Sequence, residues 1–495
     1  MICVGLVLAI WLTRLIGIDH FPPFIDEMIH VHGSELGYTV SPLMNADLGR
    51  QGTIWWMMLF QAHLGSPVWI ARAVTVLALL PGIAALMATA RLAAGYWAAA
   101  LAGLLFLFSN YHMFFGRLAL ADPIAGSAVL VAIYFAVRLS KRRSLIDALM
   151  VGIFLTVGVV AKINVAPFLG VPIAAALCLY PRRQKTKINH RDTEKFREKI
   201  RGQVIWLVVA LGTAGILIGA FVLGLRFFGY DFVTNSVSYA LTNRGNASMS
   251  GMVDSNRIIT SVQITFDLLS GYLGVVTVIL LLIAQVILIA RRQFYLVLCL
   301  FGPMIAIWAS LIQESRFLVV PVALLLLGGA IVLAQLVRER GRVVQAAAVA
   351  VIGVWAVVQW LPFTVAGIDQ PNDLPLPAVD VAQYVNSDAA GTGYPEAKAF
   401  LKDYAVREVI GLVSNCQAFR YLTMSSYTVD CPTLNPNGSS IPGLVDLMNQ
   451  KRGDDVFVLL QAIPYVPDAV PGKLVTVINR PGGGPSISIY QLSAG

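Results

Sequence analysis

Two adjacent carboxylates, Asp26 and Glu27, stand one residue after the sequence Phe-Pro-Pro-Phe at residues 21–24. A carboxylate at such a position can act as a general base toward a hydroxyl group. Because paired prolines stop a helix, we expect an irregular stretch that displays both acids. The pair alone is equally typical of a solvated acidic loop, so its interpretation depends on the rest of the chain.

Other ionisable residues stand where apolar segments begin or end, namely Arg117, Asp122, Lys162, Glu314 and Arg316. Arginine and lysine can bind a phosphate group, and arginine can do so with two parallel hydrogen bonds. Each cation also has an ordinary explanation. Arg117 can pair with Asp122, and a lysine at a segment end can extend to the lipid head groups.

A divalent metal site is a weaker prediction, with Glu27, His30 and His32 as its candidates. Two histidines two residues apart suit a strand or a loop more than one face of a helix, and no motif requires a cofactor. Trp55 and Trp56 can stack on a sugar, although tryptophan is also common at membrane interfaces.

The composition is that of a membrane protein. Of the 495 residues, 57% are hydrophobic and only 13% are charged, and the mean hydropathy is +0.73, whereas soluble domains carry about 25% charged residues. We therefore expect a polytopic α-helical membrane protein. Its eleven apolar segments are roughly 1–18, 66–90, 95–113, 123–139, 145–161, 165–180, 203–226, 259–290, 294–312, 317–336 and 343–361.

Basic residues indicate the orientation of these segments. With a cytoplasmic N-terminus, every basic cluster falls inside, and residues 181–201 alone carry nine lysines and arginines. An odd number of spans then places the C-terminal region outside. The formal net charge of +9 is therefore a topology signal with membrane lipids as partners, and it does not indicate a nucleic acid.

This topology collects the ionisable residues on the outer face, beside a first outer loop, 19–65, and a long outer loop, 227–258. Because charges at the hydrocarbon boundary are costly unless paired, we expect a charged cavity facing outward. Such a cavity suits transfer from a membrane-embedded phosphate donor. The chain has neither a P-loop nor a Gly-x-Gly-x-x-Gly turn, which argues against a soluble nucleotide as donor.

With these features the chain resembles the GT-C type membrane glycosyltransferases that use polyprenyl-phosphate sugars, in the branch of protein O-mannosyltransferases and lipid A aminoarabinose transferases. The resemblance covers residues 1–361. It rests on Asp26-Glu27, on Arg117 and Asp122 five residues apart, on Gly158–Lys162, and on Arg316-Phe317 followed by Pro321. Relatives often have Pro-Pro-Leu before an aromatic residue where this chain has residues 50–56. This difference leaves undecided how the first outer loop contacts the acceptor.

The resemblance implies a glycosyltransferase that transfers a sugar to an acceptor hydroxyl with inversion. It implies Asp26 as the base, with Glu27 and Asp122 as supporting acids. The donor phosphate contacts would be Arg117, Lys162 and Arg316, and the contacts to acceptor or sugar Glu314, Trp55 and Trp56. The implied partners are a polyprenyl-phosphate-sugar and an acceptor protein, lipid or polysaccharide, at the outer side of a plasma membrane.

The C-terminal part has its own organisation. Residues 1–361 are expected to form the membrane domain, 362–393 a proline-rich linker, and 394–495 a small extracytoplasmic α/β or α+β domain. Expected strands lie at 408–414, 455–461, 473–479 and 486–492, and expected helices at 394–404 and 443–451. Cys416 and Cys431 can form a disulfide if this domain faces an oxidising compartment.

Two other functions fit part of these features. A transporter or flippase of lipid-linked sugars needs polar residues through the spans, whereas Arg14 and Asp267 are among the few ionisable residues there. A catalytically inactive scaffold of the same fold would keep the lipid site and lose the base. The sugar and the acceptor are not readable from the residues.

Overall fold

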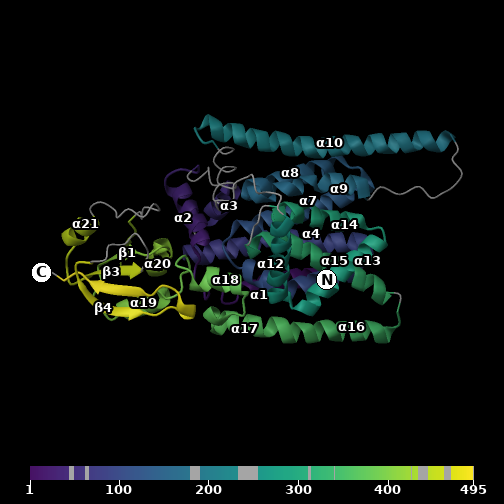
Figure 1. The fold of residues 1–495 in the computed structure, drawn as a ribbon. Helices are drawn as coiled ribbons and strands as arrows, with labels where there is room; N and C mark the ends of the chain where they lie inside the picture. Colours follow the sequence, from purple (N-terminus) through teal and green to yellow (C-terminus); the bar gives the residue numbers. More distant parts are fainter. Residues whose placement is uncertain are drawn as a thin grey trace.

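The computed structural model describes residues 1–43, 49–61, 66–178, 190–231, 255–309, 314–338, 340–424, 426–432, 444–461 and 470–493. Helices form one long bundle, and a smaller domain built on a sheet lies at one end of it (Figure 1). The long outer loop expected at 227–258 falls largely outside the described residues.

The first half of the bundle carries most of the polar residues singled out in the sequence. Its helices are α1 Ile2–Leu15, α2 Ile25–Thr39, α3 Gln51–Gln61, α4 Pro67–Ala94, α5 Tyr96–Leu107, α6 Asn110–Phe115, α7 Ala121–Arg142, α8 Leu145–Ala161, the 3-10 helix η2 Ile163–Gly170, and α9 Val171–Cys178. The expected first outer loop, 19–65, therefore contains two helices, α2 and α3.

The second half of the bundle is more purely apolar. Its helices are α10 His190–Phe227, α12 Ser255–Leu273, α13 Val275–Ala290, α14 Phe294–Ala309, the 3-10 helix η4 Ser315–Leu318, α15 Val319–Arg338, α16 Arg342–Trp355, the π-helical turn η5 Ala356–Trp360, and α17 Leu361–Asp369. Many large apolar side chains on α10, α13 and α16 are exposed, as expected where a helix faces lipid.

Every apolar segment expected from the sequence contains a helix. Among the described residues, five helices are long and apolar enough to cross a membrane, and the bent pair α12–α13 makes a sixth if it is one span. The remaining apolar helices are shorter, with 10–17 residues each. The apolar helices fit an integral membrane protein, and length and composition alone qualify five or six spans rather than eleven.

Two segments differ from the expected straight spans. α12 and α13 meet at 116°, and the break falls at Gly274, whose φ of 80° is a conformation that glycine adopts without strain. The last span continues as helix to Asp369, past the expected end at residue 361. Pro362 lies just after the π-helical turn η5, where the regular α-helical hydrogen-bond pattern is already interrupted.

The start of α2 corrects the expectation for the acidic pair. The irregular stretch that was expected to display both acids ends before them. Helix α2 begins at Ile25, so Asp26 and Glu27 lie in its first turn. A carboxylate is favoured there by the helix dipole, and Glu27 accepts a hydrogen bond from the backbone N–H of Phe24 at 3.0 Å.

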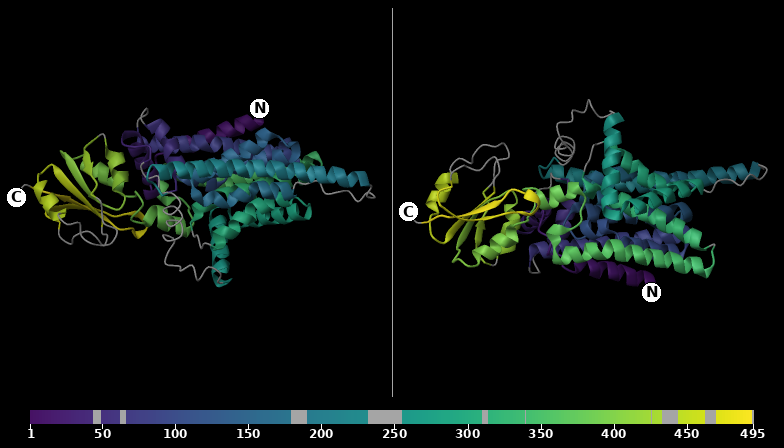
Figure 2. Two further views of the ribbon diagram at one scale, coloured as in Figure 1. Left: turned by 90° about the horizontal axis from the view of Figure 1, so that it is seen from above. Right: turned by 60° about the horizontal axis from the view of Figure 1, so that its bottom comes forward.

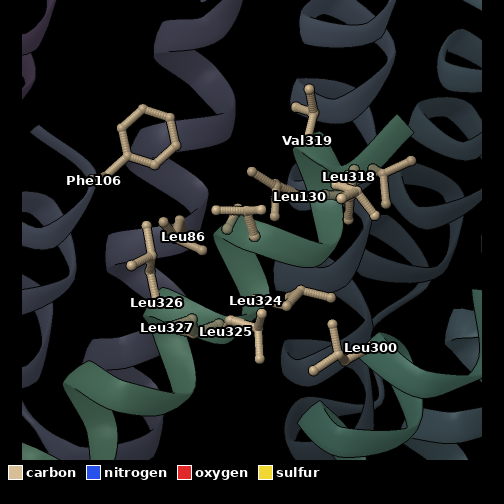
Figure 3. Close-up of a cluster of buried hydrophobic side chains, with 14 of the residues drawn as sticks. Leu86, Phe106, Leu130, Leu300, Leu318, Val319, Leu324, Leu325, Leu326 and Leu327 are labelled. Atoms are coloured by element: carbon tan, nitrogen blue, oxygen red, sulfur yellow. The ribbon is translucent and has the colours of Figure 1, made fainter. Parts of the chain in front are cut away.

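Helix α15 forms the centre of the bundle and supports the turn before it. Its leucines, among them Leu325 and Leu326, are buried against Leu86 of α4, Leu130 of α7 and Leu300 of α14 (Figure 3). Because lipid tails are as apolar as leucine, this core stabilises the bundle through close van der Waals packing. This packing fixes the position of η4, which carries one of the candidate cations.

The C-terminal domain contains a mixed five-stranded sheet and lies beyond the end of the bundle in both views of Figure 2. The strands are β1 Glu408–Leu412, β2 Thr428–Asp430, β3 Val456–Gln461, β4 Lys473–Ile478 and β5 Ile487–Gln491, in the order β2-β1-β3-β5-β4. β1 pairs parallel with β2 and β3, whereas β5 pairs antiparallel with β3 and β4. The domain helices are α19 Tyr394–Leu401, α20 Cys416–Thr423 and α21 Leu444–Gln450.

The sequence pattern located four of these strands and missed β2 and α20. β2 has only three residues, which is too short for a periodic pattern to be distinctive. Cys416 and Cys431 are joined by a disulfide, which ties the start of α20 to the end of β2.

Candidate active site

Asp26 lies between two arginines that come from distant parts of the chain. It forms ion pairs with Arg316 of η4 and, at 3.6 Å, with Arg50 just before α3. Arg316 also binds Glu314, with Nε to Oε2 at 2.6 Å. The side chain of Asp26 is 13% exposed and that of Glu314 is 39% exposed, so this arrangement opens to the outside at the two carboxylates.

A second ion pair lies beside the first. Lys162, directly after α8, donates to Oδ1 of Asp122 in the first turn of α7 at 2.6 Å, and both side chains are almost completely buried. The Lys162 ammonium also lies over the ring of Phe317, 4.5 Å from its centroid. Burial lowers the pKa of Lys162, an effect that Arg50 reinforces and Asp122 opposes.

Backbone contacts hold these two pairs together. The N–H of Ile163 donates to the carbonyl of Gly49 at 3.2 Å, and the Thr53 hydroxyl donates to the carbonyl of Ala161 at 3.0 Å. These bonds place Arg50 next to Lys162. We use the term charged cluster for the set of three carboxylates and three cations formed by Asp26, Arg50, Asp122, Lys162, Glu314 and Arg316.

His30 lies beneath the charged cluster and is uncharged. Its Nδ1 is 2.8 Å from the carbonyl oxygen of Ala119, which can only accept, so Nδ1 carries the proton and Nε2 faces Arg50 as an acceptor at 3.5 Å. Burial first, and then the charges of Arg50 and Lys162, lowers the pKa of His30 well below its usual value. His30 therefore supports Arg50 as a neutral ring.

Glu27 points away from the charged cluster. Its two oxygens accept from Arg72 at 2.8 Å each, and they also accept from the backbone N–H groups of Phe24 and Ala119. Arg72 in turn donates to the carbonyls of Ile18 and Phe21. With four donors on a fully buried carboxylate, Glu27 is arranged to fix the chain around Asp26.

Arg117 makes its contacts elsewhere. Its guanidinium donates to the backbone carbonyls of Ile16, at 2.6 Å, and of Gly17 at the end of the first helix. Burial, and next the charge of Arg72, lowers its pKa to about 10, so it stays charged at neutral pH. The sequence spacing had suggested that Arg117 pairs with Asp122. In the structure Asp122 pairs with Lys162 instead.

The three metal candidates are not brought together. His30 and His32 both lie in α2, and His32 contacts Tyr421 of α20 at 3.0 Å and Glu35 at 3.4 Å. Glu27 is occupied by Arg72. No group of three or more His, Cys, Asp or Glu residues that suits a metal occurs in the part of the chain that the structure describes.

Trp55 and Trp56 border an apolar groove rather than the charged cluster. Their indole N–H groups donate to the carbonyls of Pro42 and Val74, at 2.7 and 2.8 Å. The groove has a volume of about 510 Å3 and lies among α3, α4, α7, α8 and α10. Its lining includes Ala161, the residue before Lys162, so it ends beside the charged cluster.

Sequence reasoning missed two cations of this region, Arg50 and Arg72. Arg50 was visible only as one polar residue in an expected loop, 24 positions after Asp26. Arg72 lies within an apolar segment, where ionisable residues are rare and need a charged partner. Its position in that segment was the signal that could have identified it. Glu27 was the partner.

Residues 52–192 match the dolichyl-phosphate-mannose-protein mannosyltransferase family. No curated protein is significantly similar in sequence. The matched residues, 52–192, run from α3 to the start of α10 and include Asp122 and Lys162.

The fold is similar to that of ArnT from Cupriavidus metallidurans. The structure of that protein in the apo state has 13% sequence identity and a TM-score of 0.60, with 100% of this chain and 98% of that chain covered. The structure bound to undecaprenyl phosphate has 12% identity and a TM-score of 0.57 over the same shares. The oligosaccharyltransferase of Archaeoglobus fulgidus has 12% identity and a TM-score of 0.49, with 100% and 73% covered. The family match and the fold similarity to ArnT confirm the predicted resemblance to GT-C glycosyltransferases, the class of enzyme expected from the sequence.

Proposed function

We propose that the protein transfers a sugar from a polyprenyl-phosphate-linked donor to a hydroxyl group of an acceptor at the outer face of a membrane. The observation that carries this proposal is the charged cluster, in which a partly exposed carboxylate and three cations meet at the ends of apolar helices. A lipid phosphate needs this combination, because its charge lies at the membrane surface while its chain stays in the hydrocarbon region.

Asp26 is the proposed base. It removes the proton of the acceptor hydroxyl, whose oxygen attacks the anomeric carbon of the sugar while the bond from that carbon to the phosphate oxygen breaks. The leaving group is the polyprenyl phosphate, and a single displacement inverts the anomeric configuration. Arg50 and Arg316 orient Asp26, because both hold its carboxylate from opposite parts of the chain.

Lys162 is the proposed contact of the donor phosphate, with Arg50 beside it. Its ammonium has three donor hydrogens, of which one is directed to Asp122. Asp122 therefore holds Lys162 in place while other hydrogens stay available to a phosphate oxygen. Arg117, committed to two backbone carbonyls, is a structural residue in this proposal.

The apolar groove is the proposed seat of the polyprenyl chain. Its end at Ala161 adjoins Lys162, so a phosphate bound at Lys162 can lead directly into it. Trp55 and Trp56 line this groove, which favours a lipid contact over the earlier alternative of sugar stacking. The binding of undecaprenyl phosphate by the structurally similar ArnT supports the choice of donor.

The acceptor approaches from the side of Glu314, the most exposed member of the charged cluster. It is a protein, a lipid or a polysaccharide that carries a free hydroxyl. The disulfide between Cys416 and Cys431 supports an outward position of the C-terminal domain in the plasma membrane, because disulfides persist in oxidising compartments.

Binding of radiolabelled undecaprenyl phosphate to detergent-purified protein tests the proposal. Lys162→Ala should weaken binding about 10- to 100-fold, because a charge-assisted hydrogen bond contributes roughly 1.5–3 kcal/mol. The matched variant Arg117→Ala, checked for intact folding by thermal unfolding, should change it less than threefold. No saturable binding by the wild type, or equal losses in both variants, would remove the donor assignment.

A further inference from the structure

The segment between the bundle and the C-terminal domain contacts the two turns that carry Arg316 and Asp26. It comprises α18 Ala378–Val381, the π-helical turn η7 Ala382–Asn386 and the residues up to Gly391. We call residues 378–391 the bridging segment. The sequence suggested only a proline-rich linker here, yet most of this segment is at least partly buried.

One end of the bridging segment holds the turn that carries Arg316. Oδ2 of Asp380 accepts hydrogen bonds from the hydroxyls of Ser315 and Tyr272, at 2.6 Å each. The backbone carbonyl of Ser315 also accepts from the Tyr111 hydroxyl at 2.5 Å. Because Asp380 is completely buried and Ser315 directly precedes Arg316, this network fixes the direction from which Arg316 reaches Asp26.

The other end of the bridging segment holds the turn that carries Asp26. The N–H of Ile25 donates to the carbonyl of Ala389 at 3.1 Å, and Phe24 pairs with Ala390 as an antiparallel β-bridge. At Gly391 a Cβ atom would lie only 2.6 Å from the carbonyl oxygen of Pro23, so the two backbones are in close contact.

The C-terminal domain reinforces this second contact. Nδ2 of Asn415 donates to the carbonyl of Pro23 and to that of Ala389, at 3.0 Å each. The same amide therefore binds the turn before Asp26 and the bridging segment. Between the two ends, the ring of Tyr384 packs against that of Phe24, with centroids 4.6 Å apart.

From these contacts we infer that the bridging segment positions both partners of the Asp26–Arg316 ion pair, with Asp380 as the positioning residue on the arginine side. The inference rests on the proposed function for its catalytic meaning. It makes the C-terminal domain part of the catalytic apparatus, because the domain keeps the bridging segment in contact with both turns.

Three variants separate positioning from simple stability. Asp380→Ala removes the acceptor of both hydroxyls. Asp380→Asn keeps that acceptor, because the amide oxygen can take the place of Oδ2 while Oδ1, which has no hydrogen-bond partner, becomes the amide nitrogen. Asp147→Ala is the matched control, because its buried carboxylate pairs with Arg138 at 3.2 Å, at the end of α7 opposite to Asp122 and outside the bridging segment.

Amide hydrogen exchange of the full-length protein in lipid nanodiscs tests the inference without a substrate. Asp380→Ala should speed exchange at least tenfold both at Phe317, whose N–H bonds to Glu314, and at Ile25, at the far end of the bridging segment. Asp380→Asn should restore the slow exchange of both, and Asp147→Ala should change neither. Faster exchange at Phe317 alone, or at neither residue, would overturn the inference.

Sugar transfer gives the second readout, with a panel of undecaprenyl-phosphate-linked sugars as donors. Asp380→Ala should lower kcat at least tenfold relative to Asp380→Asn, while KM for the donor stays within threefold, because the phosphate contact at Lys162 is untouched. Equal kcat values in these two variants would refute the catalytic role. If the wild type uses no donor of the panel, the proposed function fails, and hydrogen exchange alone decides whether the bridging segment couples the two turns.

Discussion

Replacing Glu27 by glutamine should destabilise the protein without removing its chemistry. Glu27 is next to the proposed base, yet its carboxylate is buried and accepts four hydrogen bonds, two of them from Arg72. In the Glu27→Gln variant an amide nitrogen replaces one oxygen. Two N–H donors then lose their acceptor, and Arg72 keeps a buried charge without its counter-ion.

The expected loss follows from these contacts. An unsatisfied buried donor costs about 1–3 kcal/mol, and removing one partner of a buried ion pair costs about 3–5 kcal/mol. We expect Glu27→Gln to lower the free energy of unfolding by about 3–5 kcal/mol. The matched change Glu35→Gln, on the same helix but one-third exposed, should cost less than about 1 kcal/mol.

Denaturant unfolding in mild detergent, followed by tryptophan fluorescence, measures both variants. Transfer activity per folded molecule should stay within tenfold of the wild type in Glu27→Gln. A loss below about 1 kcal/mol would refute the structural role of the pair. A fully stable variant without activity would restore Glu27 as a supporting acid of the reaction.

Three further predictions concern the groove, His30 and the disulfide. Val157→Trp, on the wall of the apolar groove, should weaken binding of undecaprenyl phosphate at least tenfold, whereas Leu149→Trp, on the same helix but not on that wall, should not; equal effects in a binding assay would contradict the assigned seat of the lipid chain. Because the pKa of His30 is lowered in the folded state, the unfolded chain takes up its proton first, so stability should fall by up to about 1.4 kcal/mol per pH unit as the pH drops below 6.5. His30→Asn, whose amide can donate to Ala119 in place of Nδ1, should flatten this pH dependence of unfolding, and an unchanged slope would exclude His30 as its source. Replacing Cys416 and Cys431 by serine opens a link across 15 residues and should cost the C-terminal domain about 3 kcal/mol in denaturant unfolding, whereas an unchanged midpoint would show that the disulfide adds no stability.

The sequence predicted which ionisable residues lie together better than it predicted their individual contacts. Asp26, Asp122, Lys162, Glu314 and Arg316 could be predicted to lie together because each stands near the end of an apolar segment, and the distribution of basic residues predicts that these ends share one side. Their pairing could not be predicted, because topology gives the depth of a residue in the membrane and not its neighbours around the bundle.

The unexpected contacts of Arg117 and Glu27 have the same origin. Arg117 has the residue type and depth of a phosphate contact, but the turn before α7 directs it to the end of α1, which only the packing of the helices determines. Glu27 differs from Asp26 by one position, which on a helix is a rotation of about 100°, enough to turn it from the charged cluster into the core. The role of the bridging segment could not be read from a motif, because its contacts with the two turns are made by backbone carbonyls and one buried aspartate.

The transfer reaction of the Asp26→Asn variant tests the central claim most directly. The variant keeps the shape of the side chain but cannot take up a proton from an acceptor hydroxyl, and a lost general base lowers a rate by about 100- to 10,000-fold. With purified protein in nanodiscs, an undecaprenyl-phosphate-linked sugar that the wild type uses, and unchanged binding of undecaprenyl phosphate as the control for folding, we predict such a loss in kcat. Transfer at the wild-type rate by this variant would contradict the assignment of Asp26 as the base.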